Sequence, residues 1–308
     1  MNHPLVSVIV PNYNHAPFLD ERINSILGQT YDNYELIILD DKSTDNSIDI
    51  INRYKNCLSV SCIEVNEENS GSPFKQWWKG FEHAKGELIW IAESDDSCEK
   101  EFLSTLVEEF ENDKECVLAF CRSIRVDIQG GRLGEDGFPN DFNIDGQLFV
   151  KNKLSRYNYI VNASSAVFSK EVLLDIDSTY TSFRGCGDWV FWIEVASRGH
   201  VSFVNQPLNY FRQHGTNTTT EQTRTGKGEL EVVKVSDYLK QKGFIDWKDY
   251  LRIKIVHIYS VKYGKLSKIL SNDVKKEIVS SWSPLIISCL LVDFLYLLTK
   301  VGIKIVNR

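Results

Sequence analysis

Short apolar runs alternate with amphipathic helical patterns along roughly the first 125 residues. The runs are nearly continuous, which is typical of strands that are covered on both faces of a parallel sheet. They predict strands at residues 5–10, 36–39, 88–92 and 117–122, with helices at 18–29, 47–54, 73–84 and 100–112. This order predicts an α/β, Rossmann-like domain with a mostly parallel sheet flanked by helices.

The helix expected at 73–84 carries an aromatic stripe. Phe74, Trp77, Trp78 and Phe81 recur at the spacing of one helix face. Stripes of this kind more often face a hydrophobic core than a ligand. We therefore expect this face to pack against the sheet.

The pattern becomes irregular after about residue 125, where glycine and proline mark loops. A second group of elements then follows, with apolar stretches at 163–168, 201–204 and 208–211 and a helix at 189–197. From residue 228 the pattern is helical, at 229–240, 247–263 and 273–281. We expect one α/β domain at 1–224, with halves at 1–124 and 125–224, and an α-helical C-terminal region at 225–308.

Charge is distributed unevenly between these two regions. The 308 residues carry a net charge of −7. Residues 1–224 contain 20 Lys and Arg against 34 Asp and Glu, which gives −14, whereas residues 225–308 contain 15 against 8, which gives +7. An acidic main domain is a poor partner for nucleic acid, because phosphate contacts require cations. The basic region is compatible with an anionic surface such as a membrane.

Two further features bear on the compartment. Seven cysteines are scattered without CxxC spacing, which fits a reducing compartment better than a disulfide framework. The apolar run at 5–10 is typical of a strand rather than of a secretion signal. We therefore expect a cytoplasmic protein.

Residues 285–298 (LIISCLLVDFLYLL) form the most apolar segment, and Lys300, Lys304 and Arg308 follow it. Its 14 residues include Asp293 and fall short of the roughly 20 apolar residues that a membrane span needs. Two placements stay open. The segment is either an amphipathic helix in the interface on the cytoplasmic face of a membrane, or a helix packed on protein.

Three expected strands run into polar residues at their carboxyl ends. These residues are Pro11-Asn12-Tyr13-Asn14, Asp40-Asp41 and Glu93-Ser94-Asp95-Asp96. Parallel neighbours bring such ends to one edge of the sheet, where ligands bind. Clustered carboxylates repel one another unless solvent, a proton or a divalent cation compensates, so a diphosphate bound through Mg²⁺ or Mn²⁺ would fit here. The alternative is that Asp40, Ser43 and Asp45 cap turns and the following helix.

Five motifs follow one another along the chain. They are VSVIVPNYN at 6–14, SILGQTYDNYELIILDDKSTDNS at 25–47, GELIWIAESDD at 86–96, GDWVFW at 187–192 and YFRQH at 210–214. Their ordered series resembles family 2 glycosyltransferases with the A-type glycosyltransferase fold. The resemblance covers about residues 5–215. It implies transfer of a sugar, with inversion, from a nucleotide-sugar donor, commonly UDP-linked, to a saccharide or lipid-linked acceptor in surface polysaccharide or glycolipid synthesis.

The resemblance also assigns roles to residues of the donor half, 1–124. Asp41 would accept a hydrogen bond from the nucleobase, and Pro11, Asn12 and Tyr13 would line the nucleoside pocket. Asp95 matches the last acidic residue of the family's Asp-x-Asp motif and would bind the Mn²⁺ or Mg²⁺ on the donor diphosphate.

Two positions depart from the family pattern. Glu93, which would also contact the nucleotide sugar, stands at the first position of the Asp-x-Asp motif and is one methylene longer than aspartate. Lys42 stands where the family usually has glycine, so the turn after Asp41 must hold a side chain.

The acceptor half, 125–224, holds two further candidates. Asp188, at the start of a helix behind Gly185 and Gly187, matches the family's general base, which takes the proton of the acceptor hydroxyl as its oxygen attacks the anomeric carbon. The alternative is a plain N-cap for this helix. His214 is a candidate metal ligand or a candidate hydrogen-bond donor to phosphate. The alternative is an ordinary surface histidine. The other histidines, at 3, 15, 83, 200 and 257, fall in no metal-spaced set.

Other functional classes have weaker support. A nucleotidyltransferase would typically carry a Gly-rich loop with Lys or Arg after the first strand, and a dehydrogenase would carry G-x-G-x-x-G; residues 11–15 (PNYNH) match neither. The main alternative is a catalytically degenerate nucleotide-sugar-binding partner in a polysaccharide assembly complex. Glu93 is the feature that favours it.

Overall fold

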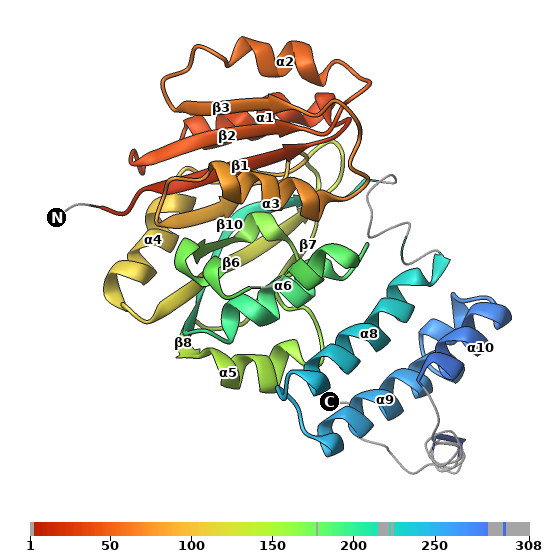
Figure 1. Ribbon diagram of the computed structural model, residues 1–308. Helices are drawn as coiled ribbons and strands as arrows, with labels where there is room; N and C mark the ends of the chain where they lie inside the picture. Colours follow the sequence, from red (N-terminus) through yellow and green to blue (C-terminus); the bar gives the residue numbers. More distant parts are fainter. Residues whose placement is uncertain (1–2, 177, 215–221, 223–224, 283–291, 294–308) are drawn as a thin grey trace. The chain divides into compact units, whose positions relative to one another are not determined.

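The computed structural model of the chain describes residues 3–176, 178–214, 222, 225–282 and 292–293 (Figure 1). The chain divides into two compact units, Met1–His214 and Gly215–Arg308, and each is described by itself. The boundary expected at residue 224 lies outside the described residues.

The first unit is built on a ten-stranded sheet with helices on both faces (Figure 1). Its strands are β1 Val6–Asn12, β2 Tyr34–Asp40, β3 Val60–Val65, β4 Leu88–Ile91, β5 Ser97–Cys98, β6 Cys116–Val126, β7 Arg132–Asp136, β8 Phe142–Asp145, β9 Ala166–Ser169 and β10 His200–Arg212. Its α-helices are α1 Ala16–Leu27, α2 Ser47–Arg53, α3 Pro73–His83, α4 Phe102–Asn112, α5 Gly146–Phe149 and α6 Gly187–Ala196.

The order of the strands confirms the predicted α/β class. The path is β3-β2-β1-β4-β9-β6-β10-β5, and the pairs β3-β2, β2-β1 and β1-β4 are parallel. Strand β1 is central in this half: Val8 pairs with Leu36 on one side and with Trp90 on the other. Beyond β4 the sheet is mixed, because β9 runs antiparallel to β4 and β6 while β10 is parallel to β6.

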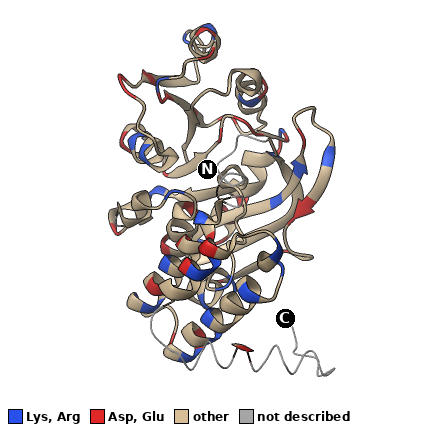
Figure 2. Ribbon diagram, turned by 90° about the vertical axis from the view of Figure 1, so that its right-hand side faces the viewer, with Lys and Arg blue, Asp and Glu red and all other residues tan. Residues whose placement is uncertain are grey.

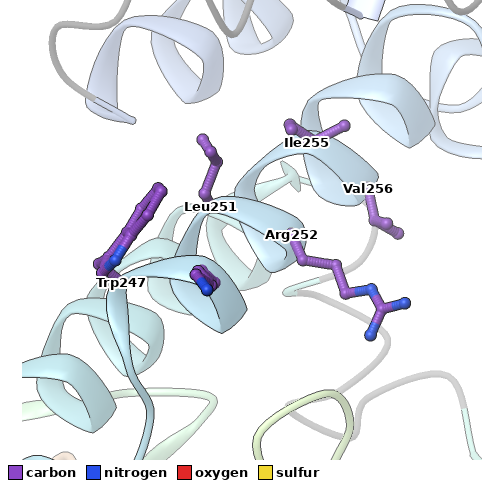
Figure 3. A pocket seen from close by; sticks show the side chains of 6 residues that line it. Trp247, Leu251, Arg252, Ile255 and Val256 are labelled. Carbon is purple, nitrogen blue, oxygen red and sulfur yellow. The ribbon is translucent and has the colours of Figure 1, made fainter.

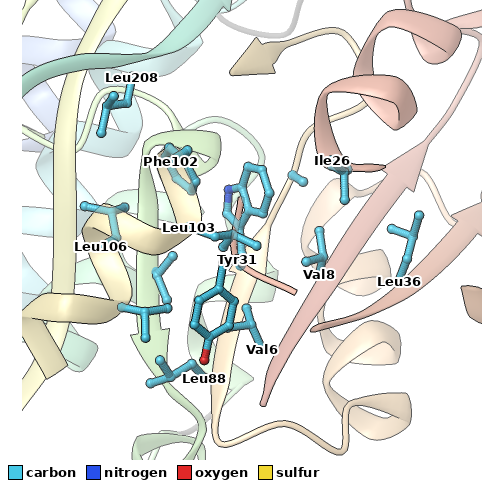
Figure 4. Close-up of a cluster of buried hydrophobic side chains, with 14 of the residues drawn as sticks. Val6, Val8, Ile26, Tyr31, Leu36, Leu88, Phe102, Leu103, Leu106 and Leu208 are labelled. Carbon is cyan, nitrogen blue, oxygen red and sulfur yellow. The ribbon is translucent and has the colours of Figure 1, made fainter. Parts of the chain in front are cut away.

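Successive residues of β1 face opposite layers of helices, so both faces of the sheet are buried. Val6 and Val8 lie in a cluster with Ile26 of α1 and Leu106 of α4 (Figure 4). Ile9 faces α3 instead, and a Cβ at Gly80 of α3 would lie 2.4 Å from its Cγ2 atom. Burial on two faces explains why these strands are continuously apolar in sequence.

The aromatic stripe of α3 is mostly core, as predicted. Phe74, Trp77 and Phe81 are buried, whereas Trp78 is 37% exposed. Phe81 stacks with Phe191 of α6 at a centroid distance of 5.8 Å, so α3 and α6 share one aromatic layer.

Some strands have no clear signal in the sequence. Strands β3 and β7 contain no fully buried residue, and polar residues interrupt their apolar ones, so neither forms a continuous apolar run. The two apolar stretches expected at 201–204 and 208–211 form one strand, β10, whose pairing with β6 shifts register around Pro207. Proline has no N–H to donate, which explains the irregular pairing at this position.

The second unit is helical in its described part. Its α-helices are α8 Lys227–Gln241, α9 Trp247–Lys262 and α10 Asn272–Ser281. They pack around a small core that includes Val233, Ile258, Ile278 and Trp282. Lys and Arg recur along these helices (Figure 2). A shallow groove on α9 is lined by Trp247, Lys248, Leu251, Arg252, Ile255 and Val256 (Figure 3).

Of the apolar segment 285–298, only residues 292 and 293 are described. Val292 is buried in the helical core, and Asp293 accepts hydrogen bonds from Lys262 and, at 2.6 Å, from the Tyr263 hydroxyl. These contacts favour the alternative that this part of the segment packs on protein. The rest of the segment lies outside the described residues. Within the described residues, every helix is too short or too polar to cross a membrane.

Candidate active site

The carboxyl ends of β1 and β2 are joined directly. Asn12 pairs with Asp40 in register, and its side-chain amide donates to Asp40 Oδ2 at 2.7 Å. The next backbone N–H, that of Asp41, donates to the Asn12 carbonyl at 2.8 Å. Asn12 is therefore buried at the end of β1, beside the end of β2, whereas the neighbouring Tyr13 side chain is 44% exposed.

Asp40 and Asp45 have structural roles in this region. Asp40 is fully buried and also accepts hydrogen bonds from the Ser43 backbone N–H and hydroxyl. Asp45 accepts from the backbone N–H groups of Ala16 and Ser47, at the starts of α1 and α2. These bonds satisfy donors that helix starts leave unpaired. The capping alternative therefore explains both residues.

Asp41 is held by a set of hydrogen-bond donors from the segment before α3 and from α3 itself. Its carboxylate accepts from the Asn66 amide (2.6 Å), the Ser70 backbone N–H and hydroxyl (2.8 Å each) and the Gln76 amide (2.9 Å). The side chain is almost fully buried, at 4% exposure. Lys42 follows with φ of 63°, a left-handed conformation that explains why glycine would suit this turn.

Glu93, two residues after the end of β4, faces α3. Its Oε1 atom accepts a hydrogen bond from the Trp77 indole N–H at 2.9 Å. Burial and the neighbouring Asp95 carboxylate raise its pKa to about 8, although the Trp77 bond partly opposes the rise. At neutral pH Glu93 is therefore mainly protonated.

Asp95 lies between two histidines from distant parts of the chain. Its Oδ2 atom is 2.8 Å from His214 Nε2. Burial would raise the Asp95 pKa, but the hydrogen bond with His214 and the electrostatic effect of the two nearby imidazoles outweigh it, so the pKa is lowered. One ligand atom each of His15, Asp95 and His214 lies within 4.8 Å of the others, a spacing that suits one metal ion.

His214 is not the surface histidine of the alternative interpretation. Its side chain is 7% exposed, and its ring stacks on Phe18 of α1 at a centroid distance of 5.5 Å. His15 lies edge-on to it at 5.5 Å. Burial lowers the pKa of His15, with Asp95 opposing the shift, so the imidazole is favoured in its neutral form, the form that binds metals.

The loop that carries Asp95 is fixed by bonds to Asp96. The Asp96 carboxylate accepts from the Asn162 amide (2.8 Å), the Ser164 hydroxyl (2.6 Å) and the Arg212 backbone N–H (2.9 Å). Burial and then Asp95 raise its pKa to about 7. The small residues around Ser164 thus support the acidic loop through hydrogen bonds, a role that their sequence did not indicate.

Two buried arginines compensate the clustered carboxylates. Arg22 is fully buried, and its guanidinium lies 4.7 Å from the Trp90 ring centroid. Its positive charge partly opposes the rise in the pKa values of Glu93 and Asp96. The Arg212 guanidinium donates to the Asp95 carbonyl at 2.9 Å. Buried cations of this kind lower the cost of holding several carboxylates together.

Asp188 lies in the first turn of α6. Its Oδ2 atom accepts a hydrogen bond from the Asn158 amide at 2.8 Å. A Cβ at Gly187 would lie 2.4 Å from Cε2 of Phe74, so this glycine is required by the close approach of α6 to the start of α3.

Helix α3 connects the three acidic candidates. Its first turns reach Asp41 through Gln76, Glu93 through Trp77 and the start of α6, beside Asp188, through Phe74. Because α3 follows β3, its N-terminal end lies where the parallel strands end. The structure thus brings together the surroundings of candidates that lie far apart in sequence.

His15 is the residue that the sequence pattern missed. Metal-ligand spacing could not find it, because its neighbours at the site come from residues 95 and 214. A usable signal was its position, three residues after the end of the central strand β1, where ligands of parallel sheets bind.

Comparisons with known proteins agree with the fold and the motifs. The profile of the family described as Glycosyl transferase family 2 matches residues 7–176. TuaG of Bacillus subtilis, named as a teichuronic acid biosynthesis glycosyltransferase, is 26% identical over 225 residues, which cover 73% of this chain and 85% of TuaG.

Two solved structures show the same fold at low identity. One is TarS residues 1–349 of S. aureus in complex with UDP, with a TM-score of 0.59 and 18% identity, covering 98% of this chain and 94% of that one. The other is the mannosyltransferase PcManGT of Pyrobaculum calidifontis in complex with GDP-Man and Mn²⁺. Its TM-score is 0.59 at 16% identity, and the match covers 97% of this chain and 81% of PcManGT. The family match spans more than half of the sequence, and the chain therefore belongs to glycosyl transferase family 2.

Proposed function

We propose that this glycosyltransferase moves a sugar, with inversion, from a nucleoside-diphosphate donor, expected to be a UDP-sugar, to an acceptor hydroxyl in surface polysaccharide or glycolipid synthesis. The observation that carries the proposal is the arrangement around α3. Helix α3 contacts Asp41 through Gln76 and Glu93 through Trp77, and its Phe74 packs at Gly187, next to Asp188. Asp95 follows Glu93 in the same acidic loop and lies beside two imidazoles.

Asp41 and the residues at the end of β1, Pro11, Asn12 and Tyr13, are proposed to bind the nucleoside. The four donors around Asp41 hold its carboxylate in one orientation, which lowers the entropy cost of binding a polar nucleobase edge. Tyr13 is exposed enough to contact a ligand, and the buried Asn12 links the end of β1 to Asp40 at the end of β2.

Asp188 is proposed as the general base. Its carboxylate would take the proton of the acceptor hydroxyl while the hydroxyl oxygen forms a bond to the anomeric carbon and the bond to the diphosphate oxygen breaks. The hydrogen bond from the Asn158 amide to Oδ2 would help to orient the carboxylate for this step. Displacement from the opposite side inverts the anomeric configuration.

Asp95 and His214 are proposed to hold Mn²⁺ or Mg²⁺ with the donor diphosphate. A carboxylate and an imidazole are suitable ligands for such an ion, and both side chains are largely buried at a common point. The bound ion would neutralise charge on the departing diphosphate. The PcManGT structure with GDP-Man and Mn²⁺ and the TarS structure with UDP support this proposal by fold similarity.

Calorimetry and a product assay test the proposal together. UDP should bind more tightly in the presence of Mn²⁺ than in its absence, and a panel of nucleotide sugars should reveal one donor from which nucleoside diphosphate is released. Release from none of the sugars, together with absent UDP binding, would contradict the proposed function.

A degenerate nucleotide-sugar-binding partner is the second candidate. It is favoured by Glu93, whose carboxyl group is turned toward Trp77 and mainly protonated at neutral pH. Such a partner should bind UDP weakly, and Mn²⁺ should not change its affinity. The calorimetric comparison therefore separates the two candidates.

Peripheral contact with the cytoplasmic face of a membrane is a dependent proposal. It rests on the charge of +7 in residues 225–308, where 15 Lys and Arg outnumber 8 Asp and Glu. The full chain should float with anionic vesicles more than a chain that ends at Ser281, and equal flotation would contradict the contact.

A further inference from the structure

The acidic loop after β4 meets a second imidazole besides that of His214. His15 follows β1, Asp95 follows β4 and His214 follows β10, so three separate strands deliver one ligand group each. We propose that His15 is a third protein ligand of the metal ion and that the resulting set of two imidazoles and one carboxylate selects Mn²⁺ over Mg²⁺. This inference rests on the proposed function, because it concerns the same metal site.

The His15 ring is held in the manner of a metal ligand. Its Nδ1 atom lies 2.8 Å from the Ser94 hydroxyl, next in sequence to Asp95, which leaves Nε2 as the nitrogen for an ion. Metal-binding histidines commonly have their second nitrogen fixed by such a hydrogen bond. The ring also lies edge-on to His214, so the two imidazoles border the same space.

The imidazole of His15 is not needed to start α1. The His15 backbone carbonyl accepts from the N–H groups of Phe18 and Leu19, but its side chain makes no capping hydrogen bond. The carboxylate of Asp45 instead accepts from Ala16 N–H at the helix start. The side chain is therefore available for another role.

The separation of the ligand atoms agrees with coordination to one ion. His214 Nε2 and Asp95 Oδ2 are 2.8 Å apart. Adjacent ligand atoms of an octahedral ion with bonds of about 2.1 Å lie about 3 Å apart, so little movement is needed to exchange this hydrogen bond for two metal bonds. Three protein ligands would leave positions for diphosphate oxygens.

The ligand chemistry sets the preference among ions. Mg²⁺ prefers oxygen ligands and loses water reluctantly, whereas imidazole nitrogen favours first-row transition metals. Two imidazoles therefore weaken the binding of Mg²⁺ relative to Mn²⁺. If Asp95 and His214 bound the ion without His15, the preference for Mn²⁺ over Mg²⁺ would be smaller.

The test uses the full chain with Mn²⁺ and no donor. Pulsed electron paramagnetic resonance, which detects nitrogen bound to Mn²⁺, should show two coordinated imidazoles in the wild type and one in His15→Gln. Loss of an outer-shell partner of a metal ligand typically costs about 10- to 100-fold in affinity, so in calorimetry His15→Gln, which removes a direct ligand, should weaken Mn²⁺ binding by at least about 100-fold, with a much smaller change for Mg²⁺. His3→Gln, in which an exposed histidine bonded to Glu111 is replaced, is the matched control and should behave as the wild type.

Two further variants make the outcome decisive. Ser94→Ala keeps the imidazole but removes its fixing bond, so it should weaken Mn²⁺ binding to a smaller extent than His15→Gln does. His15→Gln could instead retain two nitrogen signals and wild-type Mn²⁺ affinity while Asp95→Asn loses Mn²⁺ binding. In that case the assignment of His15 as a third ligand is wrong, and the metal site at Asp95 and His214 stands. If Asp95→Asn also binds Mn²⁺ normally, the metal site of the proposed function fails.

Discussion

The Nε2 atom of His214 lies 2.8 Å from Oδ2 of Asp95, although the two residues are 119 positions apart in the sequence. Asp95 follows β4, and His214 follows the last strand of the first unit, β10. Their contact joins the two halves of the sheet at one point. The halves expected to bind donor and acceptor are thus connected where the chemistry is proposed to occur.

Asp188→Asn should abolish most of the turnover. The amide cannot take a proton, and general-base catalysis typically contributes about 100- to 10,000-fold. Nucleoside diphosphate release from the identified donor measures the loss, while calorimetry should find UDP affinity unchanged. Near-normal turnover would refute the assignment of Asp188. Glu171→Gln, on a short 3-10 segment of the same half, is a suitable control and should keep full activity.

Asp41→Asn should weaken UDP binding by about tenfold or more, because charge-assisted hydrogen bonds are worth roughly 1.5–3 kcal/mol. The variant also disturbs four internal donors, so its free energy of unfolding should fall. Asp45→Asn is the matched control: it weakens the caps of α1 and α2 but should leave UDP affinity intact. Equal UDP affinities in the two variants would contradict the nucleobase role of Asp41.

Glu93→Gln should change how stability depends on pH. The pKa of Glu93 is raised from 4.5 to about 8 in the folded chain, so the contribution of this carboxyl group to stability is largest below the lower value. That contribution falls as the pH rises toward 8, by at most about 1.4 kcal/mol per unit of pKa difference. Urea unfolding of metal-free protein at pH 5 and pH 8 should show a smaller fall in Glu93→Gln.

Part of the pH dependence should remain in that variant, because the Asp96 pKa is also raised, to about 7. Glu108→Gln, at an exposed position of α4, should reproduce the wild-type slope. An unchanged slope in Glu93→Gln would show that the acid is not held in its neutral form.

Lys42→Gly should stabilise the chain by about 0.5–1 kcal/mol, because a non-glycine residue at a φ of 63° bears steric strain. Urea unfolding measures the gain. Asn14→Gly is the comparison, since Asn14 has a φ of 57° but its side chain accepts from the Thr44 N–H at 2.7 Å. That variant should gain nothing or lose stability. A loss in Lys42→Gly would show that the lysine side chain contributes more than the strain costs.

The sequence alone predicted the α/β class, the alternation of strands and helices up to residue 122 and the acidic residues that follow β2 and β4. These features are local. A strand buried on both faces must be apolar at successive positions, as in β1, and polar residues must follow where the strand leaves the core. Weakly buried strands such as β3 leave no comparable pattern, and none was predicted there.

Only the tertiary structure decided which polar side chains meet. Nothing near Glu93 in sequence indicates that Trp77 would bond its carboxyl group, or that Ser164 would hold the loop through Asp96. The approach of His15 to His214 likewise depends on the order of strands in the sheet. Apolar periodicity reports burial of each residue by itself, whereas hydrogen bonds and metal sites depend on distances between residues that folding alone brings within reach.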